Sequence, residues 1–257
     1  MKELIEKLMR NNYWKLLEMG GGGNCFVGTF ATPTRTYINV DRQVDDTLRA
    51  EFLLLVMMGF YPLSHSILLA FRQIEKLAPN DNVREKARFF VEVEEGKLAA
   101  SDWYRGVAHS ELYRRMFSSL SPTPLEIHEQ MLEQYQLALK LEEGGLARAL
   151  VTAAFIEKTG LTVLHLLHDF VAQWQVCTGK PTSVVDLTYL NEHMLHEGEE
   201  SADQHVCIID QMMYECGTLA MQKEIKHFEV VTDKWLTHIH ERVSRMIEPL
   251  SIKRLNF

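Results

Sequence analysis

The chain has 257 residues, of which 46% are hydrophobic and 24% charged, so it can bury a substantial core as one large domain or two small ones. Its formal net charge of −8 argues against nucleic acid or a membrane surface as the main partner, because both reward clustered Lys and Arg. No apolar run approaches the roughly 20 residues that span a bilayer and no secretory signal is visible, which favours a cytoplasmic location.

The N-terminal part of the chain is expected to differ from the rest. An amphipathic helix is predicted over residues 1–18 and ends at the glycine run 20–23. Residues 25–40 are rich in Thr, Phe, Val and Tyr, which predicts an extended arm or a short hairpin. We therefore expect residues 1–44 to pack on the main domain as a helix, a glycine turn and an arm.

From residue 45 onward the pattern is almost wholly helical. Helices are predicted over 48–58 and 64–77, with Pro62 interrupting or restarting the first. The later helices are predicted over 82–99, 103–120, 125–142, 146–177, 185–217 and 218–249. Because the linkers are short and no repeat is visible, residues 45–257 are predicted to form one all-α bundle domain.

The segment from Tyr189 to His205 carries imidazoles and carboxylates at helical spacing. At about 100° per residue, His193, Glu197 and Glu200 lie within roughly 60° of one another around a helix. His196 and Asp203 flank the same face, and a register shifted by one turn combines them with Glu200. Such a face suits a metal ion, whereas a solvated acidic face is the structural alternative.

Glu157 is a second signal, because it stands in an apolar stripe of the predicted helix 146–177. Its neighbours at helical spacing are Leu150, Ala153, Ala154, Gly160, Leu161 and Leu164. A carboxylate in such a place is strongly disfavoured unless it is protonated, paired or bound to a metal. The small neighbours leave room for a coordination site. A salt bridge to an Arg or Lys of another helix is the structural alternative.

His109 and the acids upstream of it form a third signal. Glu94 and Glu95 stand among aromatic and aliphatic residues, so either can turn inward, and each can equally be an acid at a helix end. His109 taken alone is more typical of a histidine at a helix surface. Together with Glu157 and the segment around His193, these groups come from four successive helical segments.

At these positions the chain resembles the heme-oxygenase-like diiron oxidases, the superfamily that also contains CADD-like, TenA-like and PqqC-like proteins. Residues 94–96 (EEG) and 109–115 (HSELYRR) are similar to the segment that contributes a Glu and a His in the family. Residues 154–160 (AFIEKTG) resemble the helix whose Glu binds iron, and residues 193–200 (HMLHEGEE) resemble the H-x3-D-x2-H helix. The similarity extends over about residues 50–220.

The resemblance implies an all-α, heme-oxygenase-like single helical bundle with an extended N-terminal arm and two non-heme iron ions. It implies an oxidoreductase that uses O2 to oxidise a small organic acid or amine, since carboxylate-bridged ferrous ions supply electrons to dioxygen. A homodimer is one assembly that the resemblance allows. The metal ligands that it implies are Glu94 or Glu95, His109, Glu157, His193 or His196, Glu197 and Glu200.

The last motif departs from the family pattern, because Glu197 and Glu200 stand where the family has Asp and His. The second iron site is therefore expected to be rich in carboxylates. Asp102, seven residues before His109, fits the shorter spacing of some members as an alternative first ligand. In CADD-like members a Tyr or Lys near the metal can itself react, and the corresponding positions to consider are Tyr104, Tyr113 and Lys158.

Two other interpretations stay open at this point. A metal-free protein of the same fold that binds a small cofactor or metabolite is favoured by the incomplete last motif. A non-enzymatic helical interaction protein is the other, with His165, His168, His193 and His196 as ordinary interface residues.

Overall fold

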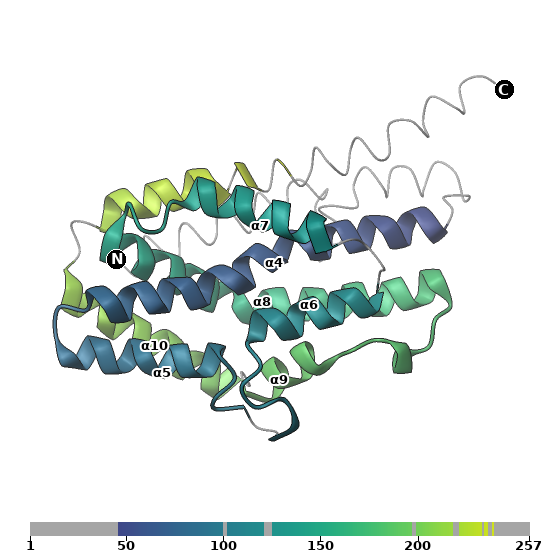
Figure 1. Ribbon diagram of the computed structural model, residues 1–257, viewed down its shortest axis with the longest axis horizontal. Helices are drawn as coiled ribbons and strands as arrows, with labels where there is room; N and C mark the ends of the chain where they lie inside the picture. Colours follow the sequence, from purple (N-terminus) through teal and green to yellow (C-terminus); the bar gives the residue numbers. More distant parts are fainter. Residues whose placement is uncertain are drawn as a thin grey trace.

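The computed structural model describes residues 46–99, 102–120, 125–196, 199–217, 221–232, 234, 235 and 238. All regular secondary structure in these residues is helical, which confirms the prediction of an all-α protein (Figure 1). The predicted N-terminal helix, glycine turn and arm lie outside the described residues. Among the helices that are described, none combines the length and the apolar character needed to cross a membrane.

The helix α4 (Asp46–Leu77) runs through the middle of the bundle and contacts α5, α6, α7 and α8 (Figure 1). The prediction of two helices broken near Pro62 was wrong, because α4 continues through the proline. A proline removes one helical hydrogen bond. Buried residues on both sides of it, including Phe60 and Ile67, pack into the core and hold the two halves together.

Three further helices follow α4 in the chain. The helix α5 (Asp81–Glu94) begins after Asn80, whose side-chain oxygen accepts a hydrogen bond from the Val83 amide at 2.8 Å. It ends five residues earlier than predicted. The 3-10 turn η1 (Asp102–Tyr104) then precedes α6 (His109–Leu120) and α7 (Leu125–Leu139), so the predicted helix 103–120 begins as a short turn and a loop.

The second half of the bundle is built on α8 (Gly145–Thr178), which packs against α4 and ends at Gly179 in a left-handed conformation. The turn η2 (Thr182–Val184) leads into α9 (Thr188–His196) and α10 (Glu199–Cys216). The single helix predicted over 185–217 is therefore two helices. Residues 221–232 are helical again.

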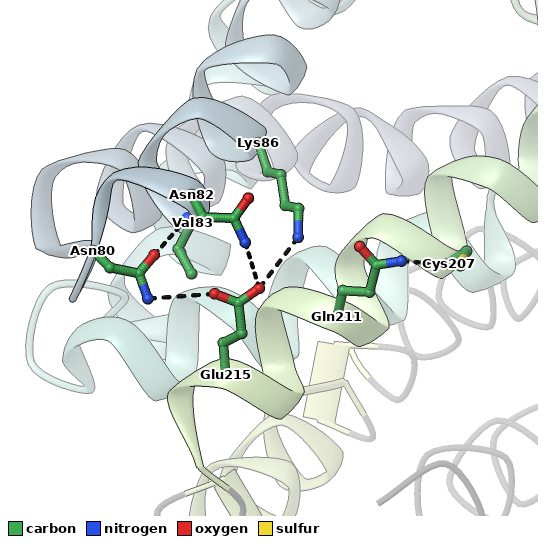
Figure 2. A network of polar contacts seen from close by, with 7 residues as sticks. All are labelled: Asn80, Asn82, Val83, Lys86, Cys207, Gln211 and Glu215. Carbon is green, nitrogen blue, oxygen red and sulfur yellow. Dashed lines mark hydrogen bonds and ion pairs between the residues drawn. The ribbon is translucent and has the colours of Figure 1, made fainter.

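A polar network ties the start of α5 to the end of α10 (Figure 2). The Glu215 carboxylate accepts hydrogen bonds from the Asn80 and Asn82 amides at 3.3 and 2.6 Å, and from the Lys86 ammonium at 3.2 Å. Asn80 therefore caps α5 and binds α10 at the same time. This network fixes how α10 lies along α5.

A buried ion pair ties α7, α8 and the segment 221–232 together. The Arg148 guanidinium donates to Glu224 at 2.6 Å, and it also donates to the carbonyls of Leu139 and Lys140 at the end of α7. Both charged side chains are at most 10% exposed. A cation at a helix C-terminus satisfies carbonyls that have no partner within the helix.

We expect Arg148→Ala to lower the free energy of unfolding by about 3–5 kcal/mol, because it leaves the Glu224 carboxylate buried without its cation. The double variant Arg148→Met/Glu224→Leu removes both charges and should recover a large part of that loss. Arg105→Ala breaks the exposed pair with Asp102 and should change stability by less than about 1 kcal/mol. Urea unfolding measures all three. Equal effects of Arg148→Ala and Arg105→Ala would contradict the role of the buried pair.

Candidate functional site

Five titratable side chains from five helices lie close together where the end of α5, the start of α6 and the helices α8, α9 and α10 meet. Glu94 Oε2 lies 3.5 Å from His109 Nδ1, and Glu157 Oε2 lies 3.7 Å from His205 Nδ1. The ring centroids of His109 and His193 are 4.4 Å apart. The sequence predicted four of these residues as ligands, and the structure brings them together with His205.

The loop between α5 and α6 places Glu94 beside His109 although 15 positions separate them. Gly96 has φ of +70°, which stops α5, and its carbonyl accepts hydrogen bonds from the amides of Ala99 and Gly106. A side chain at Gly96 would put its Cβ 2.2 Å from the Val107 carbonyl oxygen. The loop can close only with glycine at this position, and its closure brings the two helix ends together.

Glu94 is the last residue of α5 and its side chain is only 9% exposed. Burial raises its pKa well above the usual range, the nearby Glu157 charge raises it further, and His205 opposes the rise. The C-terminal end of a helix also disfavours negative charge. Glu94 therefore holds a proton, or requires a cation, more strongly than a surface glutamate does.

The tautomer of His193 follows from its hydrogen bond to the backbone. His193 Nδ1 lies 2.8 Å from the carbonyl oxygen of Tyr189, one helical turn earlier. Because a carbonyl can only accept, Nδ1 carries the proton and donates it. In the neutral ring the lone pair is then on Nε2. Metal-binding histidines have the same arrangement, in which one ring nitrogen donates a hydrogen bond and the other binds the metal.

His205 was not predicted as a ligand, although it ends the segment of imidazoles and carboxylates that begins at Tyr189. The prediction counted positions along one continuous helix and ended that count at Asp203. The chain instead forms α9 and α10, and His205 on α10 meets Glu157 of α8. The His205 ring packs edge-on against the Phe90 ring, with 5.1 Å between the ring centroids.

Two other acids that the sequence left open lie away from the cluster. Glu95 pairs with Arg72 at 2.7 Å and with Lys97, and these contacts hold its pKa below the usual range. Asp102 is 87% exposed and pairs with Arg105. Glu94 is therefore the acid that faces His109. Glu197 and the side chains of Lys158, His196 and Glu200 lie outside what the structure describes.

Two tyrosines were predicted near the site. Tyr113 is fully buried, its hydroxyl donates to the Met57 carbonyl, and its ring meets that of Tyr189 edge-on at 4.9 Å. Burial raises the pKa of Tyr113 well above its usual value, so it stays a neutral phenol. Tyr104 is buried in η1 but lines neither of the cavities beside the cluster.

The cluster lies between two cavities that share His193. A small cavity of about 60 Å³ is lined by Glu94, Tyr113, Glu157 and His193 with mostly apolar neighbours from α4 and α8. A larger pocket of about 300 Å³ opens between α5, α9 and α10 and reaches His109, His193 and His205. All three imidazoles therefore border the larger pocket.

The fold and the site define an all-helical protein with a buried group of carboxylates and imidazoles. Within the described ranges, no three His, Cys, Asp or Glu side chains already stand as ligands around one point, and the contacts are pairwise. Comparison of the chain with protein families, curated proteins and solved structures finds no match.

The raised pKa of Glu94 makes stability depend on pH. The folded protein holds this proton more tightly than the unfolded chain, whose Glu pKa is about 4.3. The free energy of unfolding should therefore fall as pH rises from about 4 through the folded pKa, and stay lower above it. In metal-free protein, Glu94→Gln removes the ionisable carboxyl and with it this loss of stability. The variant should therefore be more stable than the parent protein at pH 7, and the two should have nearly equal stability at pH 4.

Glu95→Gln is the matched control, since it changes the adjacent, outward-facing acid. Its loss of two surface ion pairs should lower stability at pH 7 by less than about 1 kcal/mol. Thermal unfolding at both pH values measures the effects. A Glu94→Gln protein that is less stable than the parent at pH 7 would contradict the assignment of Glu94 as a disfavoured buried acid.

Gly96→Ala tests the loop that sets Glu94 beside His109. Gly106→Ala is its matched control, because Gly106 also has positive φ, +81°, but nothing lies within 4 Å of the added Cβ. We expect Gly106→Ala to lower stability by about 1 kcal/mol and Gly96→Ala to lower it clearly more, since it also overlaps the Val107 carbonyl. If urea unfolding gives equal losses of stability for the two variants, the close approach of the added Cβ to the Val107 carbonyl is unimportant.

Proposed function

We propose that the protein is a heme-oxygenase-like, non-heme diiron oxidase that uses O2 to oxidise a small organic acid or amine. The observation that carries this proposal is the presence of two buried carboxylate–imidazole pairs, Glu94 with His109 and Glu157 with His205, with His193 beside them. Two such pairs suit two metal ions. The order of these residues along the chain supports the family assignment.

The side chains fit iron by their chemistry. Carboxylates and neutral imidazoles are the usual ligands of non-heme iron, and the proton on His193 Nδ1 leaves Nε2 as its ligating atom. The raised pKa of Glu94 indicates a buried carboxyl that is better satisfied by a cation than by water. His205, which lies 3.7 Å from Glu157, offers a second imidazole of the kind that the motif around His193 lacks.

The chain positions the reaction through groups that do not bind metal. Bound ferrous iron supplies the electrons that reduce dioxygen. The apolar wall of the small cavity, with Leu63, Ile67 and Leu164, excludes water from the reacting centre. Tyr113, whose hydroxyl donates to the Met57 carbonyl, lines this cavity together with Tyr189, whose ring centroid lies 4.2 Å from that of His193.

A second candidate function uses the same pocket without metal. The carboxylates and imidazoles already contact one another in pairs, and the 300 Å³ pocket has the size of a small-metabolite site. In a metal-free binding protein with this fold, the paired side chains then need no metal ion as a further partner. Iron binding distinguishes the two functions.

Protein purified without oxygen and loaded with ferrous iron should hold close to two irons per chain. Glu157→Gln and His205→Gln should each lose at least half of this iron, because each removes one member of a pair. The matched controls, Glu95→Gln at the half-buried acid paired with Arg72 and His168→Gln at an exposed position, should keep it. Metal analysis after gel filtration gives the stoichiometry, and exposure to oxygen should produce a transient visible absorption.

Two results would overturn the proposal. One is iron content near zero in the parent protein under anaerobic loading. The other is iron that binds equally well to the parent, Glu157→Gln and His205→Gln proteins, since that iron would lie elsewhere. Either result leaves the metal-free binding function as the better account of the pocket.

A further inference from the structure

The two cavities beside the cluster divide its side chains by type. The small cavity is lined by the carboxylates Glu94 and Glu157, and the larger pocket by the imidazoles His109 and His205. His193 lines both. Because Glu94 pairs with His109 and Glu157 with His205, each carboxylate–imidazole pair borders both cavities.

The small cavity has room for a gas molecule but not for an organic substrate. Its volume of about 60 Å³ is far below the roughly 300 Å³ at which pockets for small organic molecules begin. Its walls from α4 and α8 are mostly apolar and include Phe60, Ile67 and Leu164, which are all buried. A void lined mainly by apolar side chains accepts an apolar gas such as dioxygen or xenon.

The larger pocket has the size and one of the walls that an organic molecule needs. That wall is apolar, with Phe89 and Val93 from α5, Leu98 from the following loop and Ile208 from α10. Phe89 and Leu98 are 40% and 47% exposed, and the Phe89 ring centroid lies 6.2 Å from that of His205. Exposed apolar side chains gathered at a pocket of about 300 Å³ favour a ligand with an apolar body of about one ring.

We infer that dioxygen reaches the cluster through the small cavity, and that an organic substrate with an apolar body reaches it through the larger pocket. Ile67 and Leu164 then hold the gas, and Phe89 and Leu98 select the substrate. His193 stands where the two meet. The inference rests on the proposed function in one respect, that these two molecules react at the cluster. It adds a separate place for each reactant and an apolar body for the substrate.

Xenon tests the small cavity without any metal. Crystals of the full, metal-free chain that are pressurised with xenon should hold an atom beside Phe60, Ile67 and Leu164. Leu164→Phe fills the cavity and should lower the xenon occupancy at least tenfold. Gly160→Ala narrows the same cavity while favouring the helix, and should lower the occupancy at least twofold. A cavity that holds ordered water in place of xenon, or a xenon site that neither variant changes, overturns the inference.

A neutral aromatic alcohol, 2-phenylethanol, tests the larger pocket, with myo-inositol as a ring of similar size that lacks an apolar face. In NMR titrations of the metal-free chain, the aromatic alcohol should bind at least tenfold more tightly. Phe89→Ala and Leu98→Ala should each weaken it at least threefold, because each removes part of the apolar wall. Leu137→Ala, at an exposed leucine of α7, is the matched control and should change neither probe. Equal binding of the two alcohols overturns the inference.

The separation of the two cavities is tested by exchanging variants and probes. Leu164→Phe should leave binding of 2-phenylethanol within twofold, and Phe89→Ala should leave the xenon site in place. After anaerobic loading with ferrous iron, Leu164→Phe should keep the iron content of the parent and react with oxygen at least fivefold more slowly. A variant that weakens both probes alike overturns the inference.

The iron content distinguishes failure of this inference from failure of the proposed function. Two irons per chain together with probes that do not keep to their own cavities support the oxidase and overturn the inference. Xenon and 2-phenylethanol in their separate cavities, in a protein that takes up no iron, support the division of the cavities and overturn the oxidase.

Discussion

The structure depends on how a helical bundle accommodates carboxylates in its interior. Three acids whose side chains are each at most 9% exposed, Glu224, Glu94 and Glu157, receive two different treatments. Glu224 meets the Arg148 guanidinium in a hydrogen bond of 2.6 Å, which neutralises it by a permanent cation. Among the described residues, Glu94 and Glu157 are paired with imidazoles, at 3.5 and 3.7 Å. The structural acid thus has a short hydrogen bond to a permanent cation, whereas the described contacts of the two acids in the cluster are longer and involve titratable rings.

This difference separates a folding contact from a site. An imidazole can change its charge near neutral pH, donate or accept a proton, or ligate a metal, whereas a guanidinium can do none of these in a protein. The contacts of Glu94 and Glu157 are longer than a good hydrogen bond, so a cation can be bound between the members of each pair without breaking a strong interaction. The bundle therefore keeps its rigid charge pair away from the place where chemistry is proposed.

The elements that carry the cluster are fixed at some distance from it. The Glu215 network holds α10 to the start of α5 (Figure 2). Glu94 is the last residue of α5, at the other end of that helix. Gly96 then closes the loop that returns the chain to His109. Polar contacts and a tight turn outside the site thus set the spacing inside it, and the site residues need not hold the helices together themselves.

The sequence predicted what depends on local pattern and missed what depends on where helices end. Glu157 was recognisable because an acid in an apolar stripe breaks the helical period, and His193 because it stands in a dense run of ligand types. The choice between Glu94 and Glu95 required the end of α5 at Gly96, which periodicity does not encode. His205 was missed because the count assumed a continuous helix where α9 and α10 are separate. The continuity of α4 through Pro62 came from packing that only the folded bundle provides.

The same physics links the stability of the protein to its proposed activity. A buried acid with a raised pKa weakens the folded state at neutral pH, so the cluster is a place where the fold is less stable than it would be with apolar residues. A bound cation reverses this effect, because binding to the folded state alone adds its free energy to folding.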